Sequence, residues 1–549
     1  MFAKDQTWKP FFTSFWILGE PPDHLAETAS YTVGRSRVRI FEPDNSPDFL
    51  YWLSPPSFEI EDELSLLWNV VDEIWSVPPA NLDLGNFGQV RLYVRNRAGD
   101  LLALRLPRTM RKAERLTKAR FLADVLVRNA VGLGVLEILL SDPNIQDIFL
   151  DAPCERVPVH LTVAHAGGDR FHQRCVSNIL MDEGGLRNII SKLLLMSGRP
   201  FSERNPVLEM DLGGMNARLT AVRPPLSPDG IALALRRHST DPWTLTKLVY
   251  HGSLTPLAAG LISFLIDGNA TMLVTGSRGA GKSSLLGAMM FEFPTDQRIL
   301  TIEDTLELPC AELRRLGYKV QSLYVGSDSS EGQMTTEEVL KVSLRLGESA
   351  IVLGEVRGKE ARTLYEAMRV GTAGSAVLGT IHGSSSKSVY ERVVHDLGIP
   401  PQSFSATDVV VVAGLLRPRG LRNPRRRIVE ISELCKESYD GRFLQLMRYS
   451  VTQDSLIETD VLLSGSRKIR EIADSWGMSY EEALSNIHIR AECKRYIVSL
   501  AKKFGRMLLS ARFLSLANSV LLSLIEKGLS GEELLNRWKN WADVRSGYV

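Results

Sequence analysis

The stretch GSRGAGKSS, residues 276–284, decides the fold, because it satisfies the pattern G-x-x-x-x-G-K-[ST]. It directly follows the apolar run TMLVT (271–275) and overlaps the start of SSLLGAMMF (283–291). The first run has the composition of a buried strand, and the second has the spacing of a helix. The sequence therefore predicts a strand, a glycine-rich loop and a helix start in register.

Each part of this loop suits the binding of phosphates. Glycines let backbone N–H groups surround phosphate oxygens, and the positive end of the following helix adds to this attraction. Lys282 would place its charge on the outer phosphates, and Ser283 would offer a hydroxyl to Mg²⁺. The predicted ATP-binding residues are Gly276, Ser277, Arg278, Gly279, Ala280, Gly281, Lys282, Ser283 and Ser284. The alternative, a glycine-rich turn that binds nothing, is disfavoured by the flanking strand and helix.

The segment around the loop, residues 256–440, alternates short apolar runs with helical stretches. The runs are TMLVTG, RILTIED, SAIVLGE, SAVLGTIH and TDVVVVAGLL. Continuous apolar strands separated by helices are typical of a parallel sheet that is covered on both faces. We therefore expect an α/β core in which the strand ends converge on one ligand site.

Three of these strands end in residues that suit hydrolysis. Glu355 follows AIVLG and is the candidate acid for Mg²⁺, directly or through water, or for positioning the nucleophile. Glu303 and Asp304 end another strand, and Glu303 is the better candidate of the two for a general base that polarises water. His382, near Thr380, would sense the terminal phosphate. The alternatives are a strand-capping acid, a solvated acidic pair and a structural histidine.

The rest of the chain predicts further domains, since 549 residues exceed one ordinary core. We predict an N-terminal docking appendage (1–115), an α+β domain (116–245), the P-loop domain (246–445) and a helical C-terminal extension (446–549). Strands are expected to stop after about 446. Capping-box spacing at Ser479 and Ser530 marks two helix starts in the tail.

Composition excludes several classes of protein. Lys and Arg total 65 against 64 Asp and Glu, so no excess of positive charge favours nucleic acid. The five scattered cysteines form no CxxC pair, which argues against a zinc ribbon and a disulfide framework. No run approaches the length of a membrane span, and the N-terminus does not have the pattern of a signal peptide. The six arginines of LLRPRGLRNPRRRIVEI (415–431) fit a hairpin tip better than a nucleic acid surface, because no aromatic residues are interleaved.

The order GSRGAGKSS, TIEDTLEL, IVLGEVRGKEA and GTIHGSSS resembles the Walker A, Asp box, Walker B and His box of the secretion ATPase superfamily. This superfamily serves type II and type IV secretion, type IV pili and archaella. Upstream, SDPNIQDIFLDAP, RPFSERNPVLEMDL and ARLTAVRPPLSPDGIALALRRHSTDPWTLTKL are similar to its N-terminal domain and linker, particularly in the archaeal branch. The resemblance covers roughly residues 120–440. It implies a RecA-like P-loop NTPase core, a smaller α+β N-terminal domain and helical terminal extensions.

The resemblance also implies roles for residues. Glu303 would be the catalytic glutamate, Glu355 the Walker B acid and His382 the sensor, and N-terminal-domain arginines would contact the phosphates. The arginines at matching strand positions are Arg218, Arg236 and Arg237. Two features depart from the family pattern: RLGESAIVLGE lacks the usual Arg-Pro-Asp, and the tetracysteine zinc motif is absent.

The implied function is ATP hydrolysis, with Mg²⁺, that powers pilus assembly or protein secretion. The implied assembly is a homo-oligomeric ring, expected to be hexameric, at the cytoplasmic face of the membrane on a polytopic platform protein, which residues 1–115 would contact. Two alternatives stay open at this point. One is a RecA-like motor for DNA transfer or uptake, and the other is a weakly hydrolysing nucleotide-binding scaffold.

Overall fold

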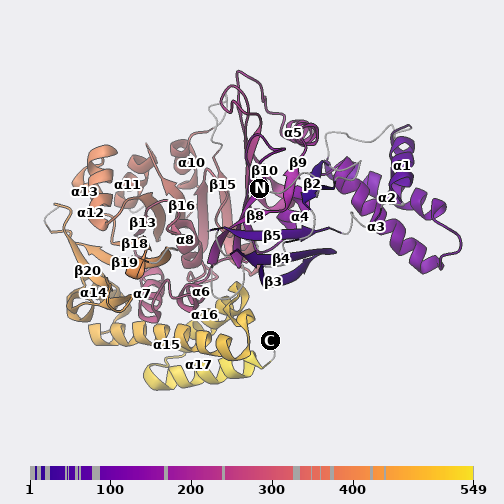
Figure 1. The fold of residues 1–549 in the computed structure, drawn as a ribbon. Coiled ribbons are helices and arrows are strands. Elements are labelled where there is room, and N and C mark those ends of the chain that lie inside the picture. Colours follow the sequence, from indigo (N-terminus) through magenta and orange to yellow (C-terminus); the bar gives the residue numbers. More distant parts are fainter. Residues whose placement is uncertain are drawn as a thin grey trace. The chain divides into compact units, whose positions relative to one another are not determined.

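The computed structural model describes residues 7–8, 14–18, 21, 25–43, 46, 48–55, 60, 63–76, 87–165, 171–237, 241–325, 334–347, 349–358, 360–370, 376–420, 424–437 and 440–547. The chain divides into two units, residues 1–240 and 241–549. Figure 1 shows their helices and strands. The division of the chain into four domains at 115, 245 and 445 stays our proposal.

The first unit is built on a nine-stranded sheet of order β10-β11-β12-β6-β7-β8-β5-β4-β3, with a smaller sheet of order β1-β2-β9. Its strands are β1 (Thr7–Trp8), β2 (Phe15–Leu18), β3 (Ala26–Val33), β4 (Ser36–Glu42), β5 (Phe49–Ser54), β6 (Ile145–Leu150), β7 (His160–His165), β8 (Phe171–Ser177), β9 (Ile179–Met181), β10 (Val207–Leu212), β11 (Ala217–Val222) and β12 (Ala232–Arg237). Its helices are α1 (Leu64–Ser76), α2 (Phe87–Arg105), α3 (Lys112–Ala130), α4 (Val135–Ser141) and α5 (Glu183–Ser197).

Residues 116–240 contain both helices and strands, as expected of an α+β segment. The segment around Asp142-Pro143-Asn144 joins α4 to β6, and α5 ends at Gly198, whose φ of 63° suits glycine. The N-terminal extension differs from the expectation, because it carries strands as well as helices. β5 pairs in parallel with β8, so strands from before and after residue 115 share one sheet.

The second unit contains the P-loop segment and one nine-stranded sheet of order β15-β14-β16-β17-β13-β18-β19-β20-β21. Its strands are β13 (Met272–Gly276), β14 (Arg298–Glu303), β15 (Lys319–Tyr324), β16 (Ala350–Val356), β17 (Val377–His382), β18 (Val409–Leu416), β19 (Arg425–Leu434), β20 (Phe443–Ser450) and β21 (Ser455–Glu458). Its helices are α6 (Leu245–Tyr250), α7 (Pro256–Asp267), α8 (Lys282–Met290), α9 (Cys310–Arg315), α10 (Thr336–Ser343), α11 (Glu360–Val370), α12 (Ser386–Glu391), α13 (Pro401–Phe404), α14 (Arg467–Trp476), α15 (Tyr480–Phe504), α16 (Ala511–Glu526) and α17 (Gly531–Ser546).

Both faces of this sheet are buried, as the apolar runs predict. The strands from β15 to β18 are parallel, and alternate residues along each strand enter two different cores. Met272 and Val274 of β13 join α7, α8 and the C-terminal helices, whereas Leu273 joins the core of α10 to α13. Figure 1 shows helices on either side of the strands. The predicted α/β fold with a RecA-like core is confirmed.

The strands continue beyond the predicted limit. β20 and β21 extend the sheet in antiparallel fashion to Glu458, so the expectation that strands stop after about 446 was wrong by twelve residues. β21 is a short edge strand of four residues, and so short a run gives little periodic signal. From α14 onward the tail is helical. Ser479 forms the predicted capping box with Glu482, whereas Ser530 starts α17 without a side-chain cap.

The C-terminal helices are fastened to the P-loop domain by a buried ion pair. Lys494 of α15 contacts both carboxylate oxygens of Glu292 at 2.8 and 2.7 Å, and its third hydrogen bond goes to Asn518. The Glu292 side chain is fully buried, at 0% exposure. Glu292 lies just after α8, the helix that begins at the P-loop lysine. The tail therefore packs behind the helix that carries the loop.

Replacing Lys494 with Met is expected to lower the free energy of unfolding by about 3–5 kcal/mol, because Glu292 would be left as an uncompensated buried charge. Urea-induced unfolding followed by tryptophan fluorescence measures this change. The neighbouring Arg495→Met is the control, since its exposed pair with Glu492 contributes about 1 kcal/mol at most. Equal losses in the two variants would contradict this interpretation.

Candidate nucleotide-binding site

The glycine-rich loop follows β13, which lies between β17 and β18. Gly276, Gly279 and Gly281 have φ values of 153°, 79° and 94°, and the last two lie clearly in the region that favours glycine. A Cβ atom on Gly276 would lie 2.2 Å from the carbonyl oxygen of Ala413 on β18. Only glycine lets the chain leave the sheet here, so the loop conformation follows directly from the motif.

The predicted loop residues form one continuous turn into α8, which begins at Lys282. Residues 277–279 are exposed, Ala280 is buried, and residues 281–284 are partly buried. Lys282 Nζ donates to the carbonyl oxygens of Gly276 and Ser277 at 3.0 and 3.3 Å. Burial lowers the pKa of Lys282, although the nearby Glu355 opposes this effect. The ammonium group is thus held at the mouth of the loop.

Four neighbouring strands bring the predicted residues to one edge of the sheet. In the order β14, β16, β17 and β13, their carboxyl ends carry Glu303, Glu355, His382 and the loop. Thr380 of β17 donates to the carbonyl oxygen of Gly354 on β16 at 2.5 Å and so links the two strands. The structure therefore brings together the glutamates, the histidine and the loop that the sequence singles out.

His382 connects the lysine to the acid. Its Nδ1 lies 3.3 Å from Lys282 Nζ, and its Nε2 lies 2.8 Å from Glu355 Oε1. Lysine only donates, so Nδ1 accepts and the ring proton sits on Nε2, facing Glu355 but not aligned as a full hydrogen bond. Burial, with the charge of Lys282, lowers the pKa of His382. The ring is therefore neutral at pH 7 and bridges the two groups.

Arg357 is a member of the cluster that the sequence reasoning missed. Its guanidinium donates to Asp304 Oδ2 at 2.6 Å and also to Glu355 Oε2. These partners raise the pKa of Arg357, with the hydrogen bond to Glu355 as the main cause. The available signal was a cation two residues after a strand-end acid. Arg357 completes a chain of contacts that runs from Lys282 through His382 and Glu355 to Asp304.

Glu303 has the environment of a general base. Its side chain is buried, and Oε1 accepts hydrogen bonds from the backbone N–H groups of Glu307 and Leu308, both at 2.8 Å. The other oxygen, Oε2, is buried without a hydrogen-bond partner among the described residues. A Cβ atom on Gly354 would lie 3.1 Å from Glu303 Cγ, so that glycine leaves room for the carboxyl group. Burial raises the pKa of Glu303 to about 7, despite the two N–H donors.

These features fit a nucleotide and Mg²⁺. The loop offers backbone N–H groups in the conformation that surrounds phosphates, and the Glu303 oxygen without a partner can receive a proton from water. Ser283 and Glu355 remain the proposed magnesium ligands. Glu355 already contacts Arg357 and His382, which favours an indirect role through water.

The three predicted arginines lie in the first unit. Arg218 and Arg236 face each other across β11 and β12, with Arg218 near Glu209 and Arg236 near Asp147. Arg237 instead donates to the carbonyl oxygens of Ile145 and Pro143. Its contacts are those of a residue that holds the start of β6. A role of Arg218, Arg236 and Arg237 at the phosphates stays a proposal.

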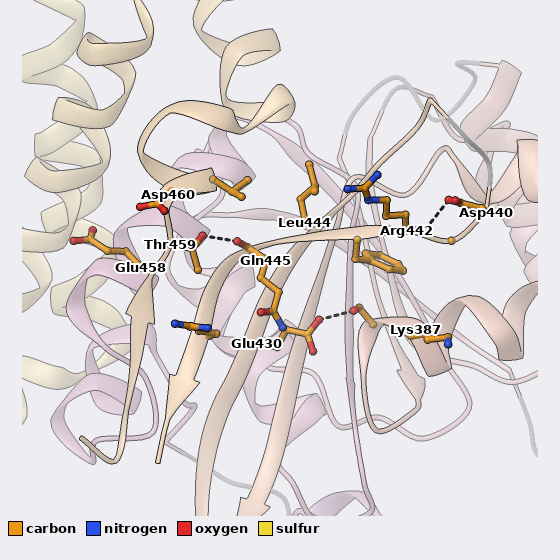
Figure 2. A pocket seen from close by; sticks show the side chains of 14 residues that line it. Lys387, Glu430, Asp440, Arg442, Leu444, Gln445, Glu458, Thr459 and Asp460 are labelled. Atoms are coloured by element: carbon orange, nitrogen blue, oxygen red, sulfur yellow. Dashed lines mark hydrogen bonds between the residues drawn. The ribbon is translucent and has the colours of Figure 1, made fainter. Parts of the chain in front are cut away.

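A separate polar cavity of about 860 Å³ lies on β19, β20 and β21. Figure 2 shows its side chains. The Ser386 hydroxyl donates a hydrogen bond to Glu430, and the Thr459 hydroxyl donates one to the backbone carbonyl of Gln445. None of the predicted site residues lines it. A search for a cavity alone would thus select a different place from the glycine-rich loop, where the predicted site residues come together.

Comparison with known proteins identifies a matching family model and several relatives in sequence. The model of the family described as "Type II/IV secretion system protein" matches residues 131–475. A "Putative conjugal transfer protein" of Mycobacterium tuberculosis (strain CDC 1551 / Oshkosh) is 30% identical over 318 residues, 56% of this chain and 86% of that protein. An uncharacterised protein of Methanocaldococcus jannaschii is 29% identical over 334 residues, 60% of this chain and 43% of that protein.

Among solved structures, the VirB11 ATPase from the Brucella suis type IV secretion system, in complex with sulphate, is similar at 24% identity and a TM-score of 0.27. The match covers 54% of this chain and 91% of that chain. A bacterial and an archaeal relative match about equally well in sequence, so the archaeal branch in particular stays a prediction. None of the helices in the described ranges combines the length and apolar character needed to cross a membrane.

Glu303 should make stability depend on pH. Its carboxyl group has a pKa of about 7 in the fold and an ordinary value of 4.5, so between these values the folded protein holds the proton more often than the unfolded chain. Stability contributed by the protonated acid is therefore lost as pH rises through about 7. We expect Glu303→Gln to raise the melting temperature at about pH 8 and to raise it less at about pH 5.

The control is Glu366→Gln, an exposed acid on α11. Differential scanning calorimetry at the two pH values makes the comparison. A Glu303→Gln effect that is independent of pH would contradict a raised pKa of this carboxyl group.

Proposed function

The chain belongs to the type II/IV secretion system protein family, whose model covers more than half of it, and from this membership we propose that it is a P-loop ATPase. It hydrolyses ATP to ADP and phosphate to power assembly of a type IV pilus-like filament or type II/IV protein secretion. The observation that carries this proposal is the convergence of the loop, Glu303, Glu355 and His382 on four adjacent strand ends.

In this proposal the loop and Lys282 bind the phosphates of ATP, and Ser283 with Glu355 holds Mg²⁺. The bound ion would neutralise charge that develops on the phosphates. Glu303 takes a proton from the attacking water, for which its pKa near 7 is well matched. Neutral His382 contacts both Lys282 and Glu355 and so fixes their positions. In this proposal it also senses the terminal phosphate of ATP.

The proposed working form is a homo-oligomeric ring, hexameric by the family resemblance. Arg218 and Arg236, and Arg237 if its carbonyl contacts are released, would add positive charge at the phosphates, from the same subunit or a neighbouring one. The ring would act at the cytoplasmic face of the membrane on a polytopic platform protein. Residues 1–115 are the proposed contact with that partner.

A motor for DNA transfer is the second candidate, and the mycobacterial relative named for conjugal transfer favours it. DNA would then stimulate ATP turnover, and this stimulation would fall steeply with salt. The near-balance of 65 basic and 64 acidic residues argues against it. ATP turnover that responds to DNA at low salt would move the proposal to this function.

Two substitutions separate nucleotide binding from hydrolysis. Lys282→Ala should weaken binding of a fluorescent ATP analogue at least about tenfold, because a charge-assisted contact to phosphate is lost. Glu303→Gln should bind the analogue like the wild type, while Mg²⁺-dependent phosphate release falls about 100-fold or more through loss of the base. Titration and a phosphate-release assay on the full chain measure the two effects.

Lys387→Ala is the matched control for Lys282, since this exposed lysine lines the polar cavity and pairs with Glu391. Turnover that survives Glu303→Gln would contradict the assignment of the base. Binding without turnover in the wild type would instead support the nucleotide-binding scaffold, which the unusual RLGESAIVLGE segment before Glu355 also favours.

A further inference from the structure

Three consecutive arginines begin β19, and they point to two different sides of the strand. Arg425 and Arg427 both reach Asp454, in the turn between β20 and β21. Arg426 lies between them in sequence and, by the alternation of a strand, faces the other way. Its Nε donates to the carbonyl oxygen of Gly279, in the middle of the glycine-rich loop, at 2.9 Å.

Asp454 holds this strand end in place. Its carboxylate receives two hydrogen bonds from Arg427, at 3.0 and 2.9 Å, and one from the hydroxyl of Tyr449 at 2.6 Å. The Arg427 hydrogen bond is the largest cause that lowers the pKa of Asp454, to about 2. Arg427 also donates to the carbonyl oxygen of Arg426 itself, at 3.0 Å. The backbone of Arg426 is therefore fixed by its neighbours, and its side chain reaches the loop from a rigid base.

The hydrogen bond to Gly279 sets the direction of a loop N–H group. A peptide unit is planar and trans, so the N–H of Ala280 points away from the Gly279 carbonyl oxygen. That N–H points into the turn, where it donates to the carbonyl oxygen of Ser277 at 3.2 Å. Gly279 has a φ of 79°, and nothing lies within 4 Å of where a Cβ atom would be, so no neighbouring side chain prevents rotation of this peptide. Arg426 supplies the constraint that glycine does not.

We propose that Arg426 is a positioning residue of the phosphate-binding loop, which holds the Gly279 carbonyl outward and so keeps the Ala280 N–H in its turn with Ser277, fixing the shape of the loop that surrounds the phosphates. This inference rests on the proposed binding of nucleotide at the loop. It assigns a role in that site to the arginine-rich hairpin between β18 and β19, in place of a nucleic acid surface. Arg426 acts through the loop and takes no part in proton transfer.

Arg426→Ala and Arg426→Lys test the inference in the full-length chain, with a fluorescent non-hydrolysable ATP analogue and Mg²⁺. The alanine variant should raise Kd about tenfold, because a hydrogen bond that fixes the shape of the phosphate-binding loop is lost. Lysine keeps one donor, so it should restore part of the affinity. In steady-state hydrolysis KM should rise while kcat stays within about twofold of the wild type.

Arg448→Ala is the control, since Arg448 is an exposed arginine on neighbouring β20 and should leave Kd unchanged. A purely structural Arg426 would lower the melting temperature of the alanine variant without changing Kd, and that result would overturn the inference. A fall in kcat at unchanged KM would also overturn it, by placing Arg426 at the reacting phosphate. If the wild-type chain binds no analogue, both the inference and the proposed function fail, whereas wild-type affinity in Arg426→Ala sinks the inference alone.

Discussion

The left-handed backbone at Gly279 and Gly281, together with the close approach of Gly276 to β18, is the constraint on which the site depends. A side chain at Gly276 would collide with the neighbouring strand, so the chain can leave β13 and start α8 only as this sequence allows. Because β13 lies beside β17, and β17 lies beside β16, the loop is fixed next to the ends of strands that carry His382 and Glu355. The parallel topology thus turns residues far apart in sequence into one group. The same topology places Glu303 of β14 one strand further along.

Electrostatics in this group alternate in sign along one chain of contacts. Lys282, neutral His382, Glu355, Arg357 and Asp304 follow one another at hydrogen-bond or ion-pair distance. Each charged member thus has a partner of opposite charge or a neutral bridge. Glu303 stands outside this series of contacts, with two N–H donors on one oxygen and, among the residues that the structure describes, none on the other. The two glutamates therefore differ: Glu355 is paired with the cation Arg357, whereas burial raises the pKa of Glu303 to about 7.

Local sequence patterns predicted the elements well, and non-local pairing accounts for what they missed. Apolar runs identified β13, β14, β16, β17 and β18 but not β15, and the loop motif identified the turn and the start of α8, because these depend on neighbours in sequence. Arg426 was missed because its partner Gly279 lies about 150 residues away, and the contact of Arg357 with Asp304, about fifty residues away, is likewise set by strand order. β20 and β21 were missed for the same reason: their pairing with β19 is a property of the sheet. The sharing of one sheet by β5 and β8 likewise carries no local signal.

The most direct test of the central claim is the pH dependence of Mg²⁺-dependent phosphate release from ATP by the full chain between about pH 5.5 and pH 9. If the strand ends form one hydrolytic centre with Glu303 as its base, the rate of release rises with pH to a plateau, with a midpoint near 7. Release that never exceeds the buffer background, or a rate that is flat across this range, would contradict the account.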